Sequence, residues 1–147
     1  MEIWELVARE SIRDLIARYN ANGDSGRFAQ VAELFADDAI YDVEGVRHIG
    51  AKGIFDVMTA AAAAMGSEGA PSVVRHLTST MQIDVTSETD ASARSYWQVI
   101  LPHGLDHWGR YLDTFRVVDG KWRFASRRVV EDGEVEGGWA HERHQVP

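Results

Sequence analysis

Hydrophobic side chains in the first half of the chain recur with the period of an α-helix. Residues 2–22, 28–35 and 52–65 each carry apolar positions three and four residues apart, which places them on one helical face. In the first segment this face holds Ile12, Leu15, Ile16 and Tyr19. Gly23 favours the end of that helix, and Asp24 can cap the next one. The pattern therefore predicts three N-terminal helices.

The second half of the chain changes to extended segments that alternate apolar and polar side chains. Including two short segments in the first half, strands are predicted at residues 39–43, 46–49, 73–85, 91–101, 107–118 and 121–130. Asp119-Gly120 indicates a tight hairpin because both turn positions require positive φ, and residues 66–71 are predicted to form a loop. Helices segregated from a run of consecutive strands indicate an α+β fold with an antiparallel meander.

The chain has the length of one domain, since it contains 147 residues and no repeat or linker divides it. We predict a domain over residues 1–130 and a C-terminal tail over residues 131–147. The tail is rich in glycine and charged residues and carries Trp139. We therefore expect the tail to be mobile or docked on a partner subunit.

Charge and composition narrow the range of partners. The net charge of −8 argues against nucleic acid and anionic membranes, both of which attract basic surfaces. The absence of cysteine removes disulfides, thiolate metal ligands and a thiol nucleophile. The N-terminus has no signal-peptide pattern, and no apolar run approaches the roughly 20 residues of a membrane span. We expect a soluble, cytoplasmic protein.

Three stretches carry a family resemblance: residues 12–39, residues 75–79 (Arg-His-Leu-Thr-Ser) and residues 109–124, which begin with Gly-Arg-Tyr-Leu-Asp-Thr-Phe and end with Lys-Trp-Arg-Phe. Together they resemble the SnoaL-like branch of the nuclear-transport-factor-2-like superfamily over about residues 5–130. The resemblance implies a cone-shaped α+β barrel, in which three N-terminal helices pack on a curved, mostly antiparallel sheet around a small-molecule pocket. It leaves the activity open, because this fold hosts enzymes, binding domains and assembly subunits.

Enzymes of this branch that the chain resembles are hexachlorocyclohexane dehydrochlorinase, scytalone dehydratase and bile-acid 7α-dehydratase. All three eliminate a small leaving group from a cyclic substrate without a metal or organic cofactor. The dehydrochlorinase pairs an aspartate with a histidine, and the resemblance places these at Asp24 and His76. An arginine that closes its last strand corresponds to Arg127, and the tyrosine of the bile-acid enzyme corresponds to Tyr19.

The chain also departs from these enzymes. The Tyr-Asp pair of scytalone dehydratase would be Tyr19-Asn20 here, which counts against a water-activating carboxylate at that place. The second long strand carries Tyr96 and Gln98 where the two dehydratases have a histidine or an aspartate. The leaving group would therefore be handled differently.

The chemistry of His76 and Asp24 suits proton abstraction. Histidine titrates near neutral pH, and a carboxylate on its second ring nitrogen fixes the tautomer and stabilises the imidazolium. General-base catalysis of this kind contributes roughly 10²–10⁴ in rate. Two other interpretations stand beside the catalytic one: Asp24 as a plain helix cap, and His76 as a surface or structural residue.

Strand alternation predicts the neighbours of His76. Strict alternation puts His76 on one face with Thr78 and Thr80, and puts Met81 and Ile83 on the opposite face. His76 then lies on the more polar face. This face could form the wall of a wet pocket or lie in solvent.

Further candidates are aromatic or cationic. Tyr19 could donate a hydrogen bond to substrate or belong to the core, and Arg127 could stabilise a leaving anion or form a surface ion pair. Tyr41, Trp97 and Tyr111 are candidate substrate-binding residues.

No metal or cofactor site is predicted. His103 and His107 flank a Pro/Gly turn, where their four-residue spacing loses the meaning that it has on a helix, and His141 and His144 are expected to be solvated. The sequence contains no P-loop, dinucleotide fingerprint or nucleophile elbow.

These observations favour a cofactor-independent lyase, of the dehydratase or dehydrohalogenase type, or an isomerase, acting on a small cyclic apolar substrate. One alternative is a non-catalytic ligand-binding or assembly module similar to a dioxygenase β subunit. Another is a ketosteroid-isomerase-like or polyketide-cyclase-like enzyme, which Asp42 or Asp113 inside the cone would favour. We expect a homo-oligomer, a dimer or a trimer, because an exposed sheet face with Trp97, Trp108 or Trp139 would need covering.

Overall fold

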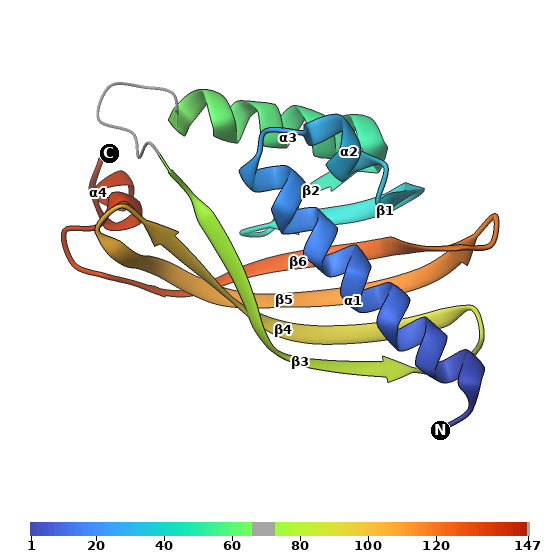
Figure 1. Ribbon diagram of the computed structural model, residues 1–147. Helices are drawn as coiled ribbons and strands as arrows, with labels where there is room; N and C mark the ends of the chain where they lie inside the picture. Colours follow the sequence, from blue (N-terminus) through green and yellow to red (C-terminus); the bar gives the residue numbers. More distant parts are fainter. Residues whose placement is uncertain (66–72, 147) are drawn as a thin grey trace.

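Four helices and six strands make up the computed structural model, which describes residues 1–65 and 73–146 (Figure 1). The helices are α1 (Ile3–Asp24), α2 (Phe28–Ala32), α3 (Gly50–Met65) and α4 (Trp139–Gln145). The strands are β1 (Phe35–Val43), β2 (Val46–Ile49), β3 (Arg75–Val85), β4 (Asp90–Leu101), β5 (Gly104–Val118) and β6 (Lys121–Glu134). The loop predicted at residues 66–71 lies outside the described residues.

The strands form a single curved sheet in the order β2-β1-β6-β5-β4-β3. All neighbours are antiparallel except β1 and β6, which run parallel. Figure 1 shows α1 crossing the sheet obliquely, while α2 and α3 cover the end near β1 and β2. The α+β fold with N-terminal helices on a mostly antiparallel sheet is thus confirmed. In the described part of the chain the sheet does not close into a barrel, so β2 and β3 remain its edges.

The core lies between α1 and the concave face of the sheet. The predicted apolar face of α1 is buried, with Ile12 and Ile16 fully inaccessible. On β4 the alternation is regular, and its buried side chains are Ala91, Ala93, Ser95, Trp97, Val99 and Leu101. Trp97 therefore faces the core, and the expectation that it lies on an exposed sheet face is wrong.

The second helix is shorter than its pattern predicts. It ends at Ala32, and Phe35 instead opens β1, because the carbonyl of Leu34 accepts a hydrogen bond from the Phe124 N–H at 2.9 Å. Phe35 and Phe124 then stack in the core with ring centroids 4.7 Å apart. Asp24 is the last residue of α1 and does not cap α2. Tertiary pairing with β6 thus overrides the helical spacing of Phe35.

A β-bulge in β3 changes which side chains share a face. Thr80 has a positive φ of 41°, and the register with β4 shifts by one residue at this point. Beyond the bulge, Met81 and Ile83 turn to the concave face that also carries His76 and Thr78. Strict alternation put them on opposite faces, and the extra residue of the bulge is the physical reason for the difference.

The C-terminal tail folds onto its own chain. Strand β6 continues to Glu134, and α4 packs beside β5 through the buried carboxylate of Asp106. This carboxylate accepts the backbone N–H groups of Trp139 at 2.7 Å and Ala140 at 3.1 Å, as well as His107 Nδ1 at 2.7 Å. Residues 131–146 of the tail thus dock on the sheet of their own chain.

No helix within the described residues is both long enough and apolar enough to cross a lipid bilayer.

We predict that Gly109→Ala destabilises the protein by about 1–3 kcal/mol, because the added methyl group overpacks the core. A Cβ at this position would lie 1.9 Å from the carbonyl oxygen of Val130 and 2.6 Å from the Trp97 ring. Urea denaturation measures the change. The matched control is Gly23→Ala, where a Cβ meets nothing within 4 Å. A Gly109→Ala variant as stable as this control would contradict the packing described.

The anchoring of α4 predicts an acid-sensitive contribution to stability. Burial opposes ionisation of Asp106, but its hydrogen bonds from Ala140, His107 and Trp139 outweigh burial and lower its pKa. A carboxyl whose pKa is lower in the folded than in the unfolded protein stabilises the fold at pH values above its unfolded-state pKa of about 3.9. This stabilisation is lost as the pH falls through the folded-state pKa. Asp106→Asn should therefore lower stability at pH 7 by about 1–3 kcal/mol and lose less on acidification than the parent. Urea denaturation at pH 7 and pH 3 measures both effects, and an unchanged pH dependence would contradict this role.

Candidate functional site

The site is built where the end of α1 meets the start of β3. Asp24 lies in the last turn of α1, and its Oδ1 is 2.5 Å from His76 Nδ1. Its other oxygen, Oδ2, accepts the backbone N–H of His76 at 2.9 Å. One carboxylate thus fixes both the backbone and the imidazole of His76.

This geometry determines what the imidazole can do. An ionised carboxylate can only accept hydrogen bonds, so Nδ1 carries a proton and Nε2 of a neutral ring is left as an acceptor. Side-chain exposure is 33% for His76 and 10% for Asp24, so the ring reaches solvent while its partner is shielded. The pair has the arrangement of a general base with an orienting carboxylate.

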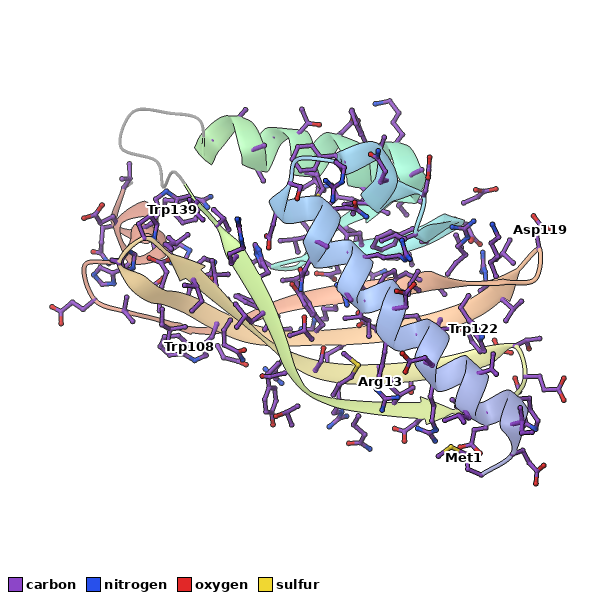
Figure 2. The ribbon with its side chains drawn as sticks, viewed as in Figure 1. Met1, Arg13, Trp108, Asp119, Trp122 and Trp139 are labelled. Carbon is purple, nitrogen blue, oxygen red and sulfur yellow. The ribbon has the colours of Figure 1, made fainter. Side chains whose placement is uncertain are left out.

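A groove of about 320 Å³ runs between α1 and β3 beside this pair. Arg13, Ile16 and Asn20 line it from α1, and Thr78 and Met81 line it from β3 together with His76. Figure 2 shows the Arg13 side chain between α1 and the β3 side of the sheet. The groove is partly open, and its lining mixes charged, polar and apolar side chains. A larger concavity of about 520 Å³ lies elsewhere, beside β6 and α4, and does not include His76 or Asp24.

Asn20 connects the groove to the core. It is buried, with 7% exposure, and its Nδ2 donates to Thr78 Oγ1 at 2.8 Å while its Oδ1 accepts from the Tyr111 hydroxyl at 3.2 Å. Sequence reasoning treated Asn20 only as a missing carboxylate. The signal that could have identified it is its place directly after Tyr19, at the end of the buried face of α1.

The candidate tyrosines lie deeper than the groove. The hydroxyls of Tyr19 and Tyr41 are 2.5 Å apart and buried. Burial raises the pKa of Tyr19 against the opposing charge of Arg127, and burial together with Tyr19 raises the pKa of Tyr41 well above its ordinary value. Both phenols therefore stay neutral. Their hydroxyls form a hydrogen bond with each other, and neither residue lines the groove beside His76.

Arg127 forms a fully buried ion pair with Asp113. Its Nε and Nη2 donate to the two carboxylate oxygens at 2.8 Å each, and both side chains have 0% exposure. The guanidinium carbon lies 3.8 Å from the Tyr111 ring centre, 4.2 Å from Tyr19 and 4.5 Å from Phe124. Burial raises the pKa of Asp113, and the charge of Arg127 only partly opposes this rise. Burial lowers the pKa of Arg127, but the charge of Asp113 and its hydrogen bonds outweigh burial and raise it. The interpretation of Arg127 as a surface ion pair is wrong.

Two aromatic candidates also face the core. Trp97 is 3% exposed and packs edge-on against the ring of His107 at 5.5 Å, with Tyr111 at 6.0 Å. Val99 pairs with both His76 and His107, so the two histidines stand in one row across the sheet. Burial lowers the pKa of His107 against the opposing Asp106, and His76 adds to the lowering. His107 therefore lies close to the site. The sequence did not indicate this, because His107 stands next to a turn.

The helices packed on a curved, mostly antiparallel sheet define this protein as a small α+β domain, with a His-Asp pair beside its groove. The family model of the SnoaL-like domain matches residues 4–128. The chain therefore belongs to the SnoaL-like family, which confirms the resemblance seen in its sequence. No curated protein matches it.

Solved structures share the fold across proteins of different kinds. A single-residue variant of Rv3472, a protein of unknown function from Mycobacterium tuberculosis, is 26% identical, with a TM-score of 0.77 over 89% of this chain and 75% of that one. Hexachlorocyclohexane dehydrochlorinase LinA-type3 from Novosphingobium barchaimii is 18% identical, with a TM-score of 0.77 over 92% and 93%. The β subunit of a candidate aromatic-ring-hydroxylating dioxygenase from Novosphingobium aromaticivorans is 24% identical, with a TM-score of 0.69 over 89% and 93%. These last two likenesses show the fold alone.

We predict that Arg127→Met destabilises the protein by about 3–5 kcal/mol, because it leaves the Asp113 carboxylate buried without its counter-charge. The double variant Arg127→Met/Asp113→Leu should recover most of the loss, since no charge then remains in the core. Chemical denaturation of the two variants and the parent measures both steps. A double variant less stable than the single one would contradict this account of the pair.

Proposed function

We propose that this protein is a cofactor-independent lyase, of the dehydratase or dehydrohalogenase type, or an isomerase, which acts on a small cyclic apolar substrate by His/Asp general acid–base chemistry. The observation that carries the proposal is the 2.5 Å contact between His76 Nδ1 and Asp24 Oδ1 beside the groove. A dehydrochlorinase of the same fold supports it as an analogy.

In the proposed reaction, His76 Nε2 removes a proton from the substrate carbon next to the one that bears the leaving group. The C–H electron pair becomes the new C=C bond, and the leaving group departs with its own bonding pair. Asp24 stabilises the imidazolium that forms, and the proton then passes to water or to the departing group. General-base catalysis of this kind supplies roughly 10²–10⁴ in rate, or about 3–5 kcal/mol.

The lining of the groove favours a small and largely apolar substrate. Ile16, Ala17 and Met81 offer apolar contacts, while Thr78, Asn20 and the Arg13 side chain add polar and charged groups beside the His-Asp pair. Small-molecule sites typically combine apolar contacts with a small number of placed polar groups. Tyr19, Tyr41, Trp97 and Tyr111 would support this site from the core, and the Tyr111 hydroxyl bonds to Asn20. Arg127 would contribute by packing over the rings of Tyr19 and Tyr111.

Substitution of the pair tests the proposed chemistry. We expect His76→Ala to lower turnover by about 10²–10⁴-fold, and Asp24→Asn to lower it by a similar factor, because the amide cannot stabilise the imidazolium. The assays are chloride release from hexachlorocyclohexane, enone absorbance from cyclic β-hydroxy ketones, and deuterium uptake from D₂O into cyclic ketones. His48→Gln, on β2 outside the groove, is the matched control. Full activity in His76→Ala would rule out this mechanism.

A second candidate, a ketosteroid-isomerase-like or polyketide-cyclase-like enzyme, is favoured by the position of Asp113. Its carboxyl is buried in the core, and burial raises its pKa against the charge of Arg127, as suits a carboxylate base. Two hydrogen bonds from Arg127 weaken this candidate because they occupy both carboxylate oxygens. Asp42 lies at the β1–β2 turn, where its Oδ1 accepts the N–H of Gly45.

Assembly into a dimer or a trimer remains part of the proposal. The convex face of the sheet exposes Leu77 (48%), Tyr96 (49%) and Leu105 (42%) on three consecutive strands. An apolar patch of this kind favours contact with a second copy of the chain. The same patch supports the alternative of an assembly module, as in the dioxygenase β subunit that shares the fold.

A further inference from the structure

The hydroxyl of Thr78 lies at the end of a chain of hydrogen bonds that begins in the core and reaches the groove. Tyr111 is 2% exposed, and its hydroxyl donates to Asn20 Oδ1 at 3.2 Å. Asn20 Nδ2 in turn donates to Thr78 Oγ1 at 2.8 Å. Thr78 and Asn20 both line the groove that also contains His76. Two buried residues, one on β5 and one on α1, thus determine the role of one hydroxyl in the groove.

The direction of this chain of bonds follows from burial. A buried phenol needs an acceptor for its O–H group, and within residues 1–65 and 73–146 the Tyr111 hydroxyl has no acceptor besides Asn20. The amide oxygen of Asn20 therefore faces Tyr111, which turns the amide NH₂ group toward Thr78. An amide turned the other way would leave the phenol proton without a partner.

Thr78 accepts the hydrogen bond from Asn20, so its own proton remains available. A threonine hydroxyl carries one donor and two acceptor lone pairs, and Thr78 Oγ1 makes no second hydrogen bond to the residues that the structure describes. Because the bonds run in one direction, each polarises the next and strengthens the last O–H group as a donor. The Thr78 side chain is half-buried in the wall of the groove, where a ligand can accept this proton.

Thr78 also stands beside the proposed base. His76 and Thr78 are two positions apart on a regularly paired part of β3, so their side chains project from one face, with backbones roughly 6–7 Å apart. In a ring ketone the carbonyl oxygen and the neighbouring C–H carbon are only two bonds apart. Such a substrate can present this carbon to His76 Nε2 while its oxygen accepts the Thr78 proton in a hydrogen bond.

We propose that Thr78 is a catalytic residue that donates a hydrogen bond to the carbonyl oxygen of the substrate, with Asn20 and Tyr111 as positioning residues. This inference rests on the proposed function, and it narrows the substrate to a cyclic ketone or β-hydroxy ketone. His76 Nε2 removes the proton next to the carbonyl, the C–H electron pair forms a C=C bond, and the carbonyl π pair moves onto oxygen. The Thr78 O–H group stabilises the enolate oxygen as its charge develops.

The enolate then leads to one of two products. In a β-hydroxy ketone the carbonyl re-forms and the enolate C=C pair becomes the C=C bond of the enone, while the hydroxyl leaves with its bonding pair and takes the imidazolium proton as water. In a ketone without that hydroxyl, the imidazolium returns a proton to carbon, which exchanges the hydrogen or moves a neighbouring double bond. A chlorinated ring without a carbonyl offers Thr78 no oxygen, so its elimination would not depend on this residue.

Binding of two isosteric rings, cyclohexanone and methylenecyclohexane, tests the role of Thr78 without relying on turnover. NMR titration that follows the His76 signals measures both affinities. We expect Thr78→Val, which replaces the hydroxyl by a methyl group, to weaken cyclohexanone binding by about 3–10-fold and to leave methylenecyclohexane binding unchanged. Thr78→Ser should keep the parental affinity for the ketone. Ser79→Ala is the matched control, because Ser79 is exposed, bonds to Gln98 and does not line the groove.

Asn20→Asp tests the positioning residue. A carboxylate at this position can only accept hydrogen bonds, so it would draw the Thr78 proton away from the groove. This variant should lose the preference for the ketone over the hydrocarbon although Thr78 is still present. Circular dichroism of every variant separates this loss from loss of the fold.

Turnover separates this inference from the proposed function. Deuterium uptake from D₂O into cyclohexanone should fall by about 10²–10³-fold in kcat in Thr78→Val, with a smaller change in KM. Equal weakening of both rings, an unchanged cyclohexanone affinity in Thr78→Val, or no saturable cyclohexanone binding to the parent would overturn the inference. Thr78-dependent ketone binding without deuterium uptake would support the hydrogen bond and contradict the proposed function.

Discussion

The Asp24 carboxylate ties the last turn of α1 to the edge strand β3 through two hydrogen bonds, one to the backbone and one to the imidazole of His76. These bonds position the helix along the groove and hold one ring nitrogen, so that the other is free to accept a proton. A carboxylate with both oxygens engaged stays in one orientation, which a solvated helix cap would not require. The proposed chemistry depends on this contact.

Behind the groove, a second polar arrangement is closed off from solvent. Arg127 and Asp113 satisfy most of each other's hydrogen-bonding capacity, and the rings of Tyr19, Tyr111 and Phe124 surround the guanidinium. Within this pair, Arg127 Nη1 is left without a hydrogen-bond partner among the described residues. Burying an ion pair carries a desolvation cost that offsets much of the attraction between the two charges. Through Tyr111 the pair also holds Asn20, the polar link to the groove.

Local sequence rules failed where long-range pairing competed with them. The helical spacing that reached Phe35 was overridden by parallel pairing with Phe124, which buries two stacked rings. The alternation along β3 was broken at Thr80, where one extra residue rotates Met81 and Ile83 onto the groove face. The Asp106 carboxylate, by contrast, had no sequence signal as an anchor, because its donors lie more than thirty residues away on α4.

From the sequence alone, the buried face of α1, the long strands, the α+β class and the family could be determined, because each depends on periodicity or on contiguous motifs. Asp24 and His76 could be named from the resemblance. Their contact could not be predicted, because a separation of 52 positions in sequence does not say how far apart two residues lie in space. Only the tertiary structure decided that Arg127 forms a buried ion pair with Asp113, that the hydroxyls of Tyr19 and Tyr41 form a hydrogen bond, and that α4 packs against the sheet. Those outcomes depend on sheet curvature, register shifts and packing, which arise only when distant segments of the chain meet.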